Sequence, residues 1–179
     1  MKEVSNTQFA EQARCSKYDG VPYTKLDCQG FVEEVLKDCG VRKADGTPYN
    51  WKGSNSMWRN ALLWRGTIAE CLHRYGEIPI GAWVFIIKND GGEKDKGYND
   101  NEGNASHVGI YARTGDEPVR DSTRSTKRNG VGYRSISAFT HVGLPYMIDY
   151  TYNSILPVNT TKEEALKALE TIRNYIERS

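Results

Sequence analysis

The order of its periodic segments is the feature that most constrains the fold of this chain. Helical spacing of apolar residues predicts four helices, at residues 5–17, 28–39, 54–64 and 67–76. Apolar stretches rich in β-branched and aromatic residues predict strands at residues 82–88, 107–113 and 146–152. The stretch PVRDSTRS, residues 118–125, is expected to form a further strand between the last two. Residues 126–144 read as a loop with short strand-like pieces. The predicted helices come first along the chain and the predicted strands follow one another after them. This order predicts an α+β fold with an antiparallel sheet.

The size and charge of the chain exclude several classes of protein. Its 179 residues suit one compact domain, and 38% hydrophobic with 26% charged residues is typical of a globular protein. The formal net charge of +1 argues against a basic nucleic-acid-binding protein. No apolar run is long enough to cross a bilayer, so we expect no membrane span.

The two ends of the chain give further expectations. The first residues, MKEVSNTQFAEQARC, lack the apolar core of a signal peptide, which predicts synthesis in the cytoplasm without a secretion signal. Near the other end, the pattern changes after LPVNTT. We therefore expect one domain at residues 1–155, followed at 156–179 by a linker and an amphipathic helix with a capping box from Thr161 to Glu164.

The chain has four cysteines, Cys15, Cys28, Cys39 and Cys71. They form neither a Cys-x-x-Cys pair nor a cysteine–histidine cluster with zinc spacing, so we expect no structural metal. Without an export signal, reduced thiols are the default. Cys28 differs from the other three because it stands at the start of a predicted helix, in LDCQGFVEEVLKDCGVR.

A thiol at the start of a helix has a chemical use. Free backbone N–H groups and the positive end of the helix dipole favour a thiolate at that place. Gly30 leaves room for a substrate to approach the helix. The alternative is a small buried cysteine that packs beneath the helix, and Cys39, on the apolar stripe, fits that description. Cys28 precedes the stripe and is therefore the candidate nucleophile.

A nucleophilic cysteine needs a base, and the base needs a polar group that fixes its orientation. Among the three histidines, His107 opens a predicted strand directly after a polar loop, where its side chain can meet a helix terminus. His73, in a predicted helix, and His141 suit structural roles. Asp121 stands on the next predicted strand and could lie beside His107 in a hairpin, with Ser122 as the neighbouring alternative.

Charged side chains around Asp121 also allow a simpler interpretation. Asp121 could be a surface carboxylate that pairs with Arg120 or Arg124. The segment that follows, RSTKRNG, is locally basic, which is typical of a solvated loop. The catalytic interpretation of Asp121 therefore depends on its distance from His107.

Three segments, in this order, resemble those of a known family. GVPYTKLDCQGFV resembles the nucleophile segment of the NlpC-type cell-wall cysteine peptidase superfamily, which is related to CHAP domains. GAWVFIIK resembles the strand that follows, and NASHVGIY resembles the histidine segment. The resemblance covers about residues 7–150. This chain departs from the family pattern at Gln29, where Ser is usual, and in the short stretch between Tyr23 and Asp27.

The resemblance implies a fold, an activity and a substrate. The fold is papain-like, with the cysteine at the start of a helix that packs on an antiparallel sheet carrying the histidine. The implied triad is Cys28, His107 and Asp121, and no cofactor is required. Many members of the family hydrolyse peptidoglycan stem peptides at the γ-D-glutamyl bond to the diamino acid, so we expect this endopeptidase activity.

The resemblance also implies substrate-binding residues. Tyr23, Asp27 and Ser106 match the positions that hold the free amine of the N-terminal L-alanine of the stem peptide. An ammonium beside the Asp27 carboxylate is a charge-assisted contact, so the assignment is chemically reasonable. Asp27 has a second interpretation, because an Asp directly before a helix also caps it.

Two other functions stay open from the sequence. An N-acetylmuramoyl-L-alanine amidase of CHAP type needs no pocket for a free alanine amine and would tolerate replacement of Asp27 and Ser106. A non-catalytic cell-wall-binding or virion structural module could keep the same fold. The lack of a signal peptide and of wall-binding repeats fits a phage or prophage protein that reaches the cell wall after lysis or in a virion.

Overall fold

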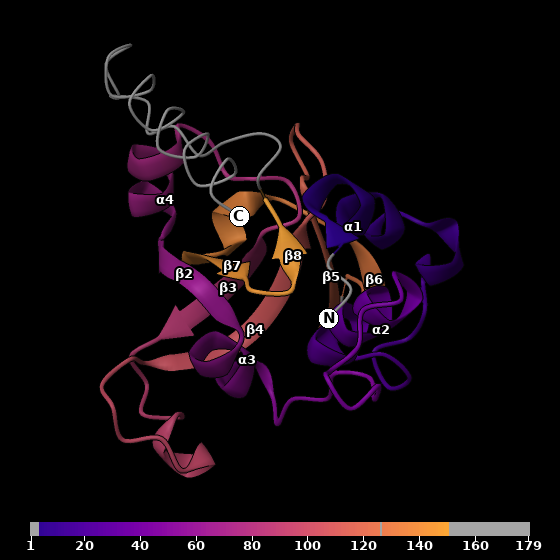
Figure 1. Ribbon diagram of the computed structural model, residues 1–179. Helices are drawn as coiled ribbons and strands as arrows, with labels where there is room; N and C mark the ends of the chain where they lie inside the picture. Colours follow the sequence, from indigo (N-terminus) through magenta and orange to yellow (C-terminus); the bar gives the residue numbers. More distant parts are fainter. Residues whose placement is uncertain (1–3, 126, 151–179) are drawn as a thin grey trace, which may run out of the picture.

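Figure 1 shows the computed structural model of the chain, which describes residues 4–125 and 127–150. In this part of the chain, six strands form one antiparallel sheet in the order β2-β7-β3-β4-β5-β6. These strands are β2 (Leu62–Thr67), β3 (Trp83–Lys88), β4 (Asn104–Tyr111), β5 (Val119–Arg124), β6 (Asn129–Arg134) and β7 (His141–Pro145). A separate parallel pair joins β1 (Val4–Ser5) to β8 (Ile148–Asp149). The predicted α+β class with an antiparallel sheet is confirmed.

The helices of the described residues pack on both faces of the six-stranded sheet. The α-helices are α1 (Asn6–Ala13), α2 (Cys28–Asp38), α3 (Ser54–Asn60) and α4 (Ile68–Tyr75), and the 3-10 helices are η1 (Ser16–Tyr18), η2 (Lys94–Lys96) and η3 (Ile136–Ala138). One apolar cluster joins the sheet to α1, α2 and α3 through Phe9, Phe31 and Met57. A second cluster joins it to α4 through Cys71. In Figure 1, α4 accordingly lies on the opposite side of the sheet from α1 and α2.

Strand β3 shows why the sheet is covered on both faces. Trp83 and Phe85 belong to the first apolar cluster, whereas Val84, between them, belongs to the second. Successive side chains of a strand point to opposite faces, so β3 is buried from both sides. This explains the unbroken apolar run WVFII, because a strand with only one buried face would alternate with polar residues.

One predicted helix is too long. The helix predicted at residues 54–64 ends at Asn60, and residues 62–67 form the edge strand β2 instead. Ala61-Leu62-Leu63 favours a helix in isolation, but tertiary pairing overrides such weak preferences. β2 pairs with β7, and the Leu62 side chain lies directly over Gly143 of that strand. The predicted helix at 5–17 is likewise shorter, because α1 ends at Ala13.

The stretch predicted as a loop, residues 126–144, contains the strands β6 and β7. Glycine has a low strand propensity, and Gly130, Gly132 and Gly143 hide both strands from a pattern search. Gly132 lies beneath the Arg128 side chain, and Gly143 beneath Leu62, so these two glycines make room for a neighbour. The last predicted strand, at 146–152, is reduced within the described residues to the two residues of β8.

Two predictions lie at the ends of the chain. The linker and helix predicted at residues 156–179 lie outside the described residues. The described residues of the predicted domain at 1–155 contain both sheets and all the helices named above. Within residues 4–125 and 127–150, none of the helices combines the length and the hydropathy that crossing a membrane requires.

Helix α2 begins and ends where the sequence predicted. Asp27 is the N-cap, and its carboxylate accepts a hydrogen bond from the N–H of Gly30 at 2.7 Å. At the other end, Gly40 adopts a φ of 76°, and its N–H donates to the carbonyl of Lys37 at 3.0 Å. These two caps fix the helix register and therefore place Cys28 at its first position.

Gly130 holds the segment before α2 against strand β6. The N–H of Gly20 donates to the carbonyl of Val131 at 3.2 Å, and the N–H of Val131 donates to the carbonyl of Val21 at 3.0 Å. Between these bonds, Gly130 has a φ of 140°, and a Cβ there would overlap the Val21 carbonyl. Only glycine fits this close backbone approach. Tyr23 follows Val21 by two residues, so Gly130 also helps to place the site described below.

We predict that Gly130→Ala lowers the free energy of unfolding by about 2 kcal/mol or more, because a side chain must push Val21 away and adopt a strained φ. Urea denaturation measures this change. Gly115→Ala is the matched control, because Gly115 also has a positive φ, of 104°, but has nothing within 4 Å of the added Cβ. Equal losses in the two variants would show that the close approach to Val21 is unimportant.

Candidate active site

Cys28 is the first residue of α2, and its side chain is only 8% exposed. The N–H groups of Cys28 and Gln29 open the helix and have no intrahelical acceptor. The N–H of Gly30 differs, because the Asp27 carboxylate caps it. Two backbone donors therefore stay available beside the thiol, and they lie at the positive end of the helix dipole.

A bulge in β4 sets the position of His107. Ile86 of β3 pairs with His107 and Ile87 pairs with Ala105, which leaves Ser106 between them without a partner in the β3–β4 ladder. Such an extra residue redirects the side chains that follow it. Ala105 and Val108 consequently both enter the apolar cluster beneath α2, although they are three positions apart.

His107 contacts both of the other predicted catalytic residues. Its Nε2 lies 2.7 Å from Oδ2 of Asp121, whose side chain has no solvent exposure. Burial favours the neutral imidazole, but hydrogen bonds with Asp121 and Cys28 outweigh burial and raise the pKa of His107 to about 9. Because Asp121 occupies Nε2, the nitrogen left for the thiol is Nδ1. The structure thus brings the three predicted residues together.

The raised pKa of His107 also links this pair to folding stability. A group whose pKa is higher in the folded state stabilises the fold most fully below its ordinary pKa, here 6.5. That contribution decreases as the pH rises and is lost above a pH of about 9. The His107–Asp121 pair therefore stabilises the protein at neutral pH, where the imidazolium predominates.

Two arginines of the β5–β6 hairpin hold Asp121 in place. Arg128 binds Oδ1 of Asp121, and Arg134 lies 3.5 Å from Oδ2. Burial alone would raise the pKa of Asp121, but the hydrogen bond with His107 and the charge of Arg128 keep it below its usual value. Asp121 is therefore a buried anion at neutral pH. The sequence did not reveal either arginine as its partner.

The alternatives considered for Asp121 do not match the observed contacts. Arg120 pairs with Asp19, and Arg124 lies over the ring of Tyr23, so neither is the ion-pair partner of Asp121. The Ser122 hydroxyl donates to a carbonyl, that of Leu26, rather than to His107. Ser122 thus ties β5 to the segment before α2, while Asp121 faces the imidazole.

The other two histidines lie elsewhere. His73 is an exposed residue of α4. His141 lies on β7, where its Nδ1 is 2.8 Å from the hydroxyl of Thr140 and its ring packs edge-on against Trp58. Burial lowers the pKa of His141. Neither histidine contacts Cys28 through any interaction found among the described residues.

Aromatic rings border the pair formed by Cys28 and His107. Phe139 stacks on the His107 ring with centroids 5.9 Å apart. The Tyr23 hydroxyl forms a hydrogen bond with Cys28. Burial, together with the nearby Cys28 and Asp27, raises the pKa of Tyr23 to about 12, so its hydroxyl stays protonated at neutral pH. Tyr23 is thus a hydrogen-bond donor next to the thiol.

Tyr23 and Asp27 line one pocket, of about 360 Å³, next to the start of α2. The residues that line this Tyr23 pocket are Tyr23, Thr24, Lys25, Asp27, Gly30 and Arg124. Ser106, predicted to join Tyr23 and Asp27, is not among them. It is exposed in the β4 bulge, and its hydroxyl donates to the carbonyl of Ile86 at 3.2 Å. The structure therefore unites two of the three predicted substrate-binding residues.

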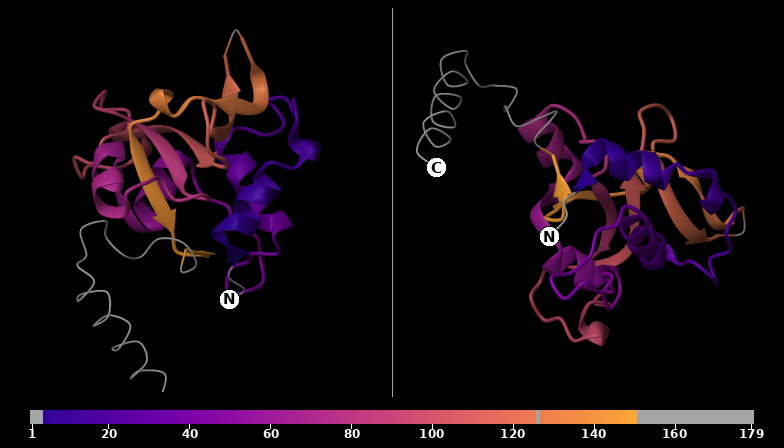
Figure 2. Two further views of the ribbon diagram at one scale, coloured as in Figure 1. Left: turned by 90° about the horizontal axis from the view of Figure 1, so that it is seen from above. Right: turned by 45° about the vertical axis from the view of Figure 1, so that its right-hand side comes forward.

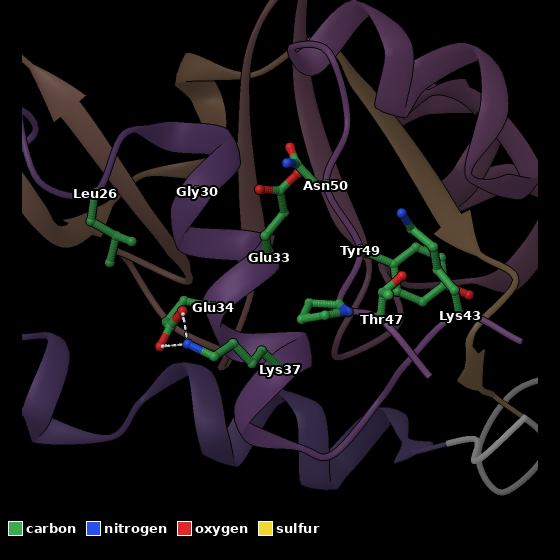
Figure 3. Close-up of a pocket in the computed structure, with 10 residues that line it drawn as sticks. Leu26, Gly30, Glu33, Glu34, Lys37, Lys43, Thr47, Tyr49 and Asn50 are labelled. Carbon is green, nitrogen blue, oxygen red and sulfur yellow. Dashed lines mark hydrogen bonds and ion pairs between the residues drawn. The ribbon is translucent and has the colours of Figure 1, made fainter. Parts of the chain in front are cut away.

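A larger pocket, of about 550 Å³, follows α2 beyond Gly30. In Figure 3, α2 contributes Glu33 and Glu34 to the pocket, and Lys43, Thr47 and Tyr49 lie across from the helix. Oε1 of Glu33 accepts hydrogen bonds from the N–H of Trp51 at 2.6 Å and from the Gln29 amide at 2.8 Å. Gly30 lines this Glu33 pocket and the Tyr23 pocket alike, so the two adjoin two residues after Cys28.

This arrangement suits acyl transfer by a thiol. It contains a nucleophile, a base oriented by a buried carboxylate, and backbone donors where an oxyanion would form. Within residues 4–125 and 127–150, no group of three or more His, Cys, Asp or Glu side chains could hold a metal ion. Comparisons of the chain with family models, curated proteins and solved structures found no match. The function must therefore be argued from the site itself.

We predict that NMR titration of His107 gives a pKa of about 9 and that Asp121→Asn lowers this pKa, because the variant loses the carboxylate that stabilises the imidazolium. His141 is the internal control, since it does not contact Asp121 and its signal should titrate identically in both proteins. An unchanged His107 pKa in Asp121→Asn would contradict the geometry described above.

Proposed function

We propose that this chain is a cysteine peptidase of papain-like fold that hydrolyses peptidoglycan stem peptides. The observation that carries the proposal is the contact of one imidazole, that of His107, with both Cys28 and a buried carboxylate. A papain-like arrangement is supported by the cysteine that opens α2, by the histidine on β4 and by Asp121 on the adjacent strand β5.

The first half of the proposed reaction forms a thioester. The Cys28 proton resides on His107, and the thiolate attacks the amide carbon of the substrate. The N–H groups of Cys28 and Gln29 face the developing oxyanion, because no intrahelical acceptor occupies them. When the tetrahedral intermediate collapses, His107 gives its proton to the leaving amine, and the acyl group stays on sulfur.

The second half releases the acid. His107, now neutral, takes a proton from water, and the resulting hydroxide attacks the thioester carbon. Cys28 leaves as the thiolate and again pairs with the imidazolium. Throughout the cycle Asp121 keeps Nε2 of His107 occupied, so that Nδ1 performs every proton transfer. The mechanism needs no cofactor.

The substrate class is proposed from the resemblance to NlpC-type peptidases and from the Tyr23 pocket. Asp27 presents a carboxylate there, and only its Oδ1 is used by the helix cap. The second oxygen can receive the ammonium group of an N-terminal alanine. The adjoining Glu33 pocket continues from Gly30 along α2 and gives room for further residues of a peptide bound in the Tyr23 pocket.

Digestion of purified peptidoglycan and free stem peptides, followed by mass spectrometry, tests this function. We predict new termini at the γ-D-glutamyl bond to the diamino acid, with activity reduced roughly 10⁴-fold or more in Cys28→Ala. Cys39→Ala is the matched control, because Cys39 is at the opposite end of α2, and this variant should keep full activity.

Two outcomes would change the proposal. Cleavage of the muramoyl–alanine bond would retain the Cys28 mechanism but make the protein an amidase. No cleavage of any peptidoglycan bond by the wild-type chain would overturn the peptidase function and leave a binding module with this fold.

A further inference from the structure

The Tyr23 pocket carries more positive than negative charge. Arg124 and Lys25 line it together with a single carboxylate, that of Asp27. In the part of the chain that the structure describes, no ion pair involves Arg124 or Lys25. Asp27, in contrast, already accepts the N–H of Gly30. A pocket with two such cations is suited to an anionic group as well as to an ammonium.

Arg124 is held close to the reacting atoms. It is the last residue of β5, the strand that also carries Asp121. Its guanidinium lies over the Tyr23 ring, 5.2 Å from the ring centroid, and the hydroxyl of that ring contacts Cys28. One tyrosine side chain therefore separates the guanidinium from the thiol. This stacking restricts the side chain, although Arg124 is exposed, and leaves its N–H groups free to bind a ligand.

From these contacts we propose that Arg124, assisted by Lys25, binds a free carboxylate of the substrate residue whose carbonyl Cys28 attacks. The inference rests on the proposed peptidase function and adds a specificity to it. A guanidinium binds a carboxylate through two parallel hydrogen bonds, which a neutral carboxamide cannot reproduce. The pocket would therefore distinguish an acidic residue from its amidated form.

A γ-linked glutamyl residue has the required chemistry. Its side-chain carbonyl forms the scissile amide, so its α-carboxylate stays free, a short aliphatic spacer away from the attacked carbon. A cation that binds this carboxylate must therefore lie near the thiol without contacting it. Arg124 is in such a position, because the Tyr23 side chain lies between its guanidinium and Cys28. Asp27 on the same pocket then accepts the ammonium of the preceding residue, so both substrate charges are matched.

The experiment compares two stem peptides that differ only at this group, one with the free α-carboxylate and one with the α-carboxamide. For the full chain we expect kcat/KM to favour the carboxylate peptide by about tenfold or more, as one charge-assisted hydrogen bond provides. In Arg124→Gln this ratio should fall close to one, and in Lys25→Gln it should fall partly. Arg74→Gln is the matched control, because Arg74 is also an exposed arginine over a tyrosine ring, on α4, and it should keep the wild-type ratio.

Measuring peptide binding, without cleavage, tests this inference separately from the proposed peptidase function. Calorimetry with the full-length Cys28→Ala chain measures the dissociation constants of both peptides without turnover, and we expect the same preference and its loss on adding Arg124→Gln. Cleavage of both peptides at equal rates, or a preference that survives Arg124→Gln, overturns the inference and leaves the peptidase proposal intact. If the wild-type chain cleaves neither peptide, the peptidase function fails, and equal dissociation constants would then overturn the carboxylate subsite too.

Discussion

The site depends on a fully buried carboxylate, that of Asp121, and on the cations that compensate its charge. Removing a carboxylate from water is costly unless hydrogen bonds and opposite charges replace the lost hydration. His107 supplies one such partner, and Arg128 and Arg134 of the β5–β6 hairpin supply two more. This hairpin projects from the rest of the sheet (Figure 2), so the geometry of the candidate site is built partly on a peripheral element.

The same carboxylate connects the sheet to α2. Asp121 orients His107 from one side, and His107 meets Cys28 at the helix start. The neighbouring residue of β5, Ser122, donates to the Leu26 carbonyl and so ties the strand to the segment that caps the helix. Successive residues of a strand face opposite sides, so one short strand can orient the imidazole of His107 through Asp121 and also hold the segment before α2 through Ser122.

Local signals made the central residues predictable. The helix start at Cys28 and the two strands that carry His107 and Asp121 stood out because caps and periodicity depend on nearby residues. The strand predicted from His107 onward begins earlier, because β4 starts at Asn104 and His107 lies within it. Other features could not be predicted from the sequence. They are the β4 bulge at Ser106, the arginines Arg128 and Arg134 that pair with Asp121, and the strands β6 and β7. Each of these depends on contacts between distant segments, and glycines that accommodate a neighbour, such as Gly132 under Arg128, read locally as loop.

The most direct test of the account is to trap its covalent intermediate. The full chain is mixed with a stem peptide, quenched in acid within the first turnover, and analysed by intact mass and peptide mapping. The account predicts a thioester of the acyl fragment on Cys28, formed at a rate that depends on His107 in its protonated state. An acyl adduct on another residue, or cleavage of the peptide with no adduct at any time, would contradict it.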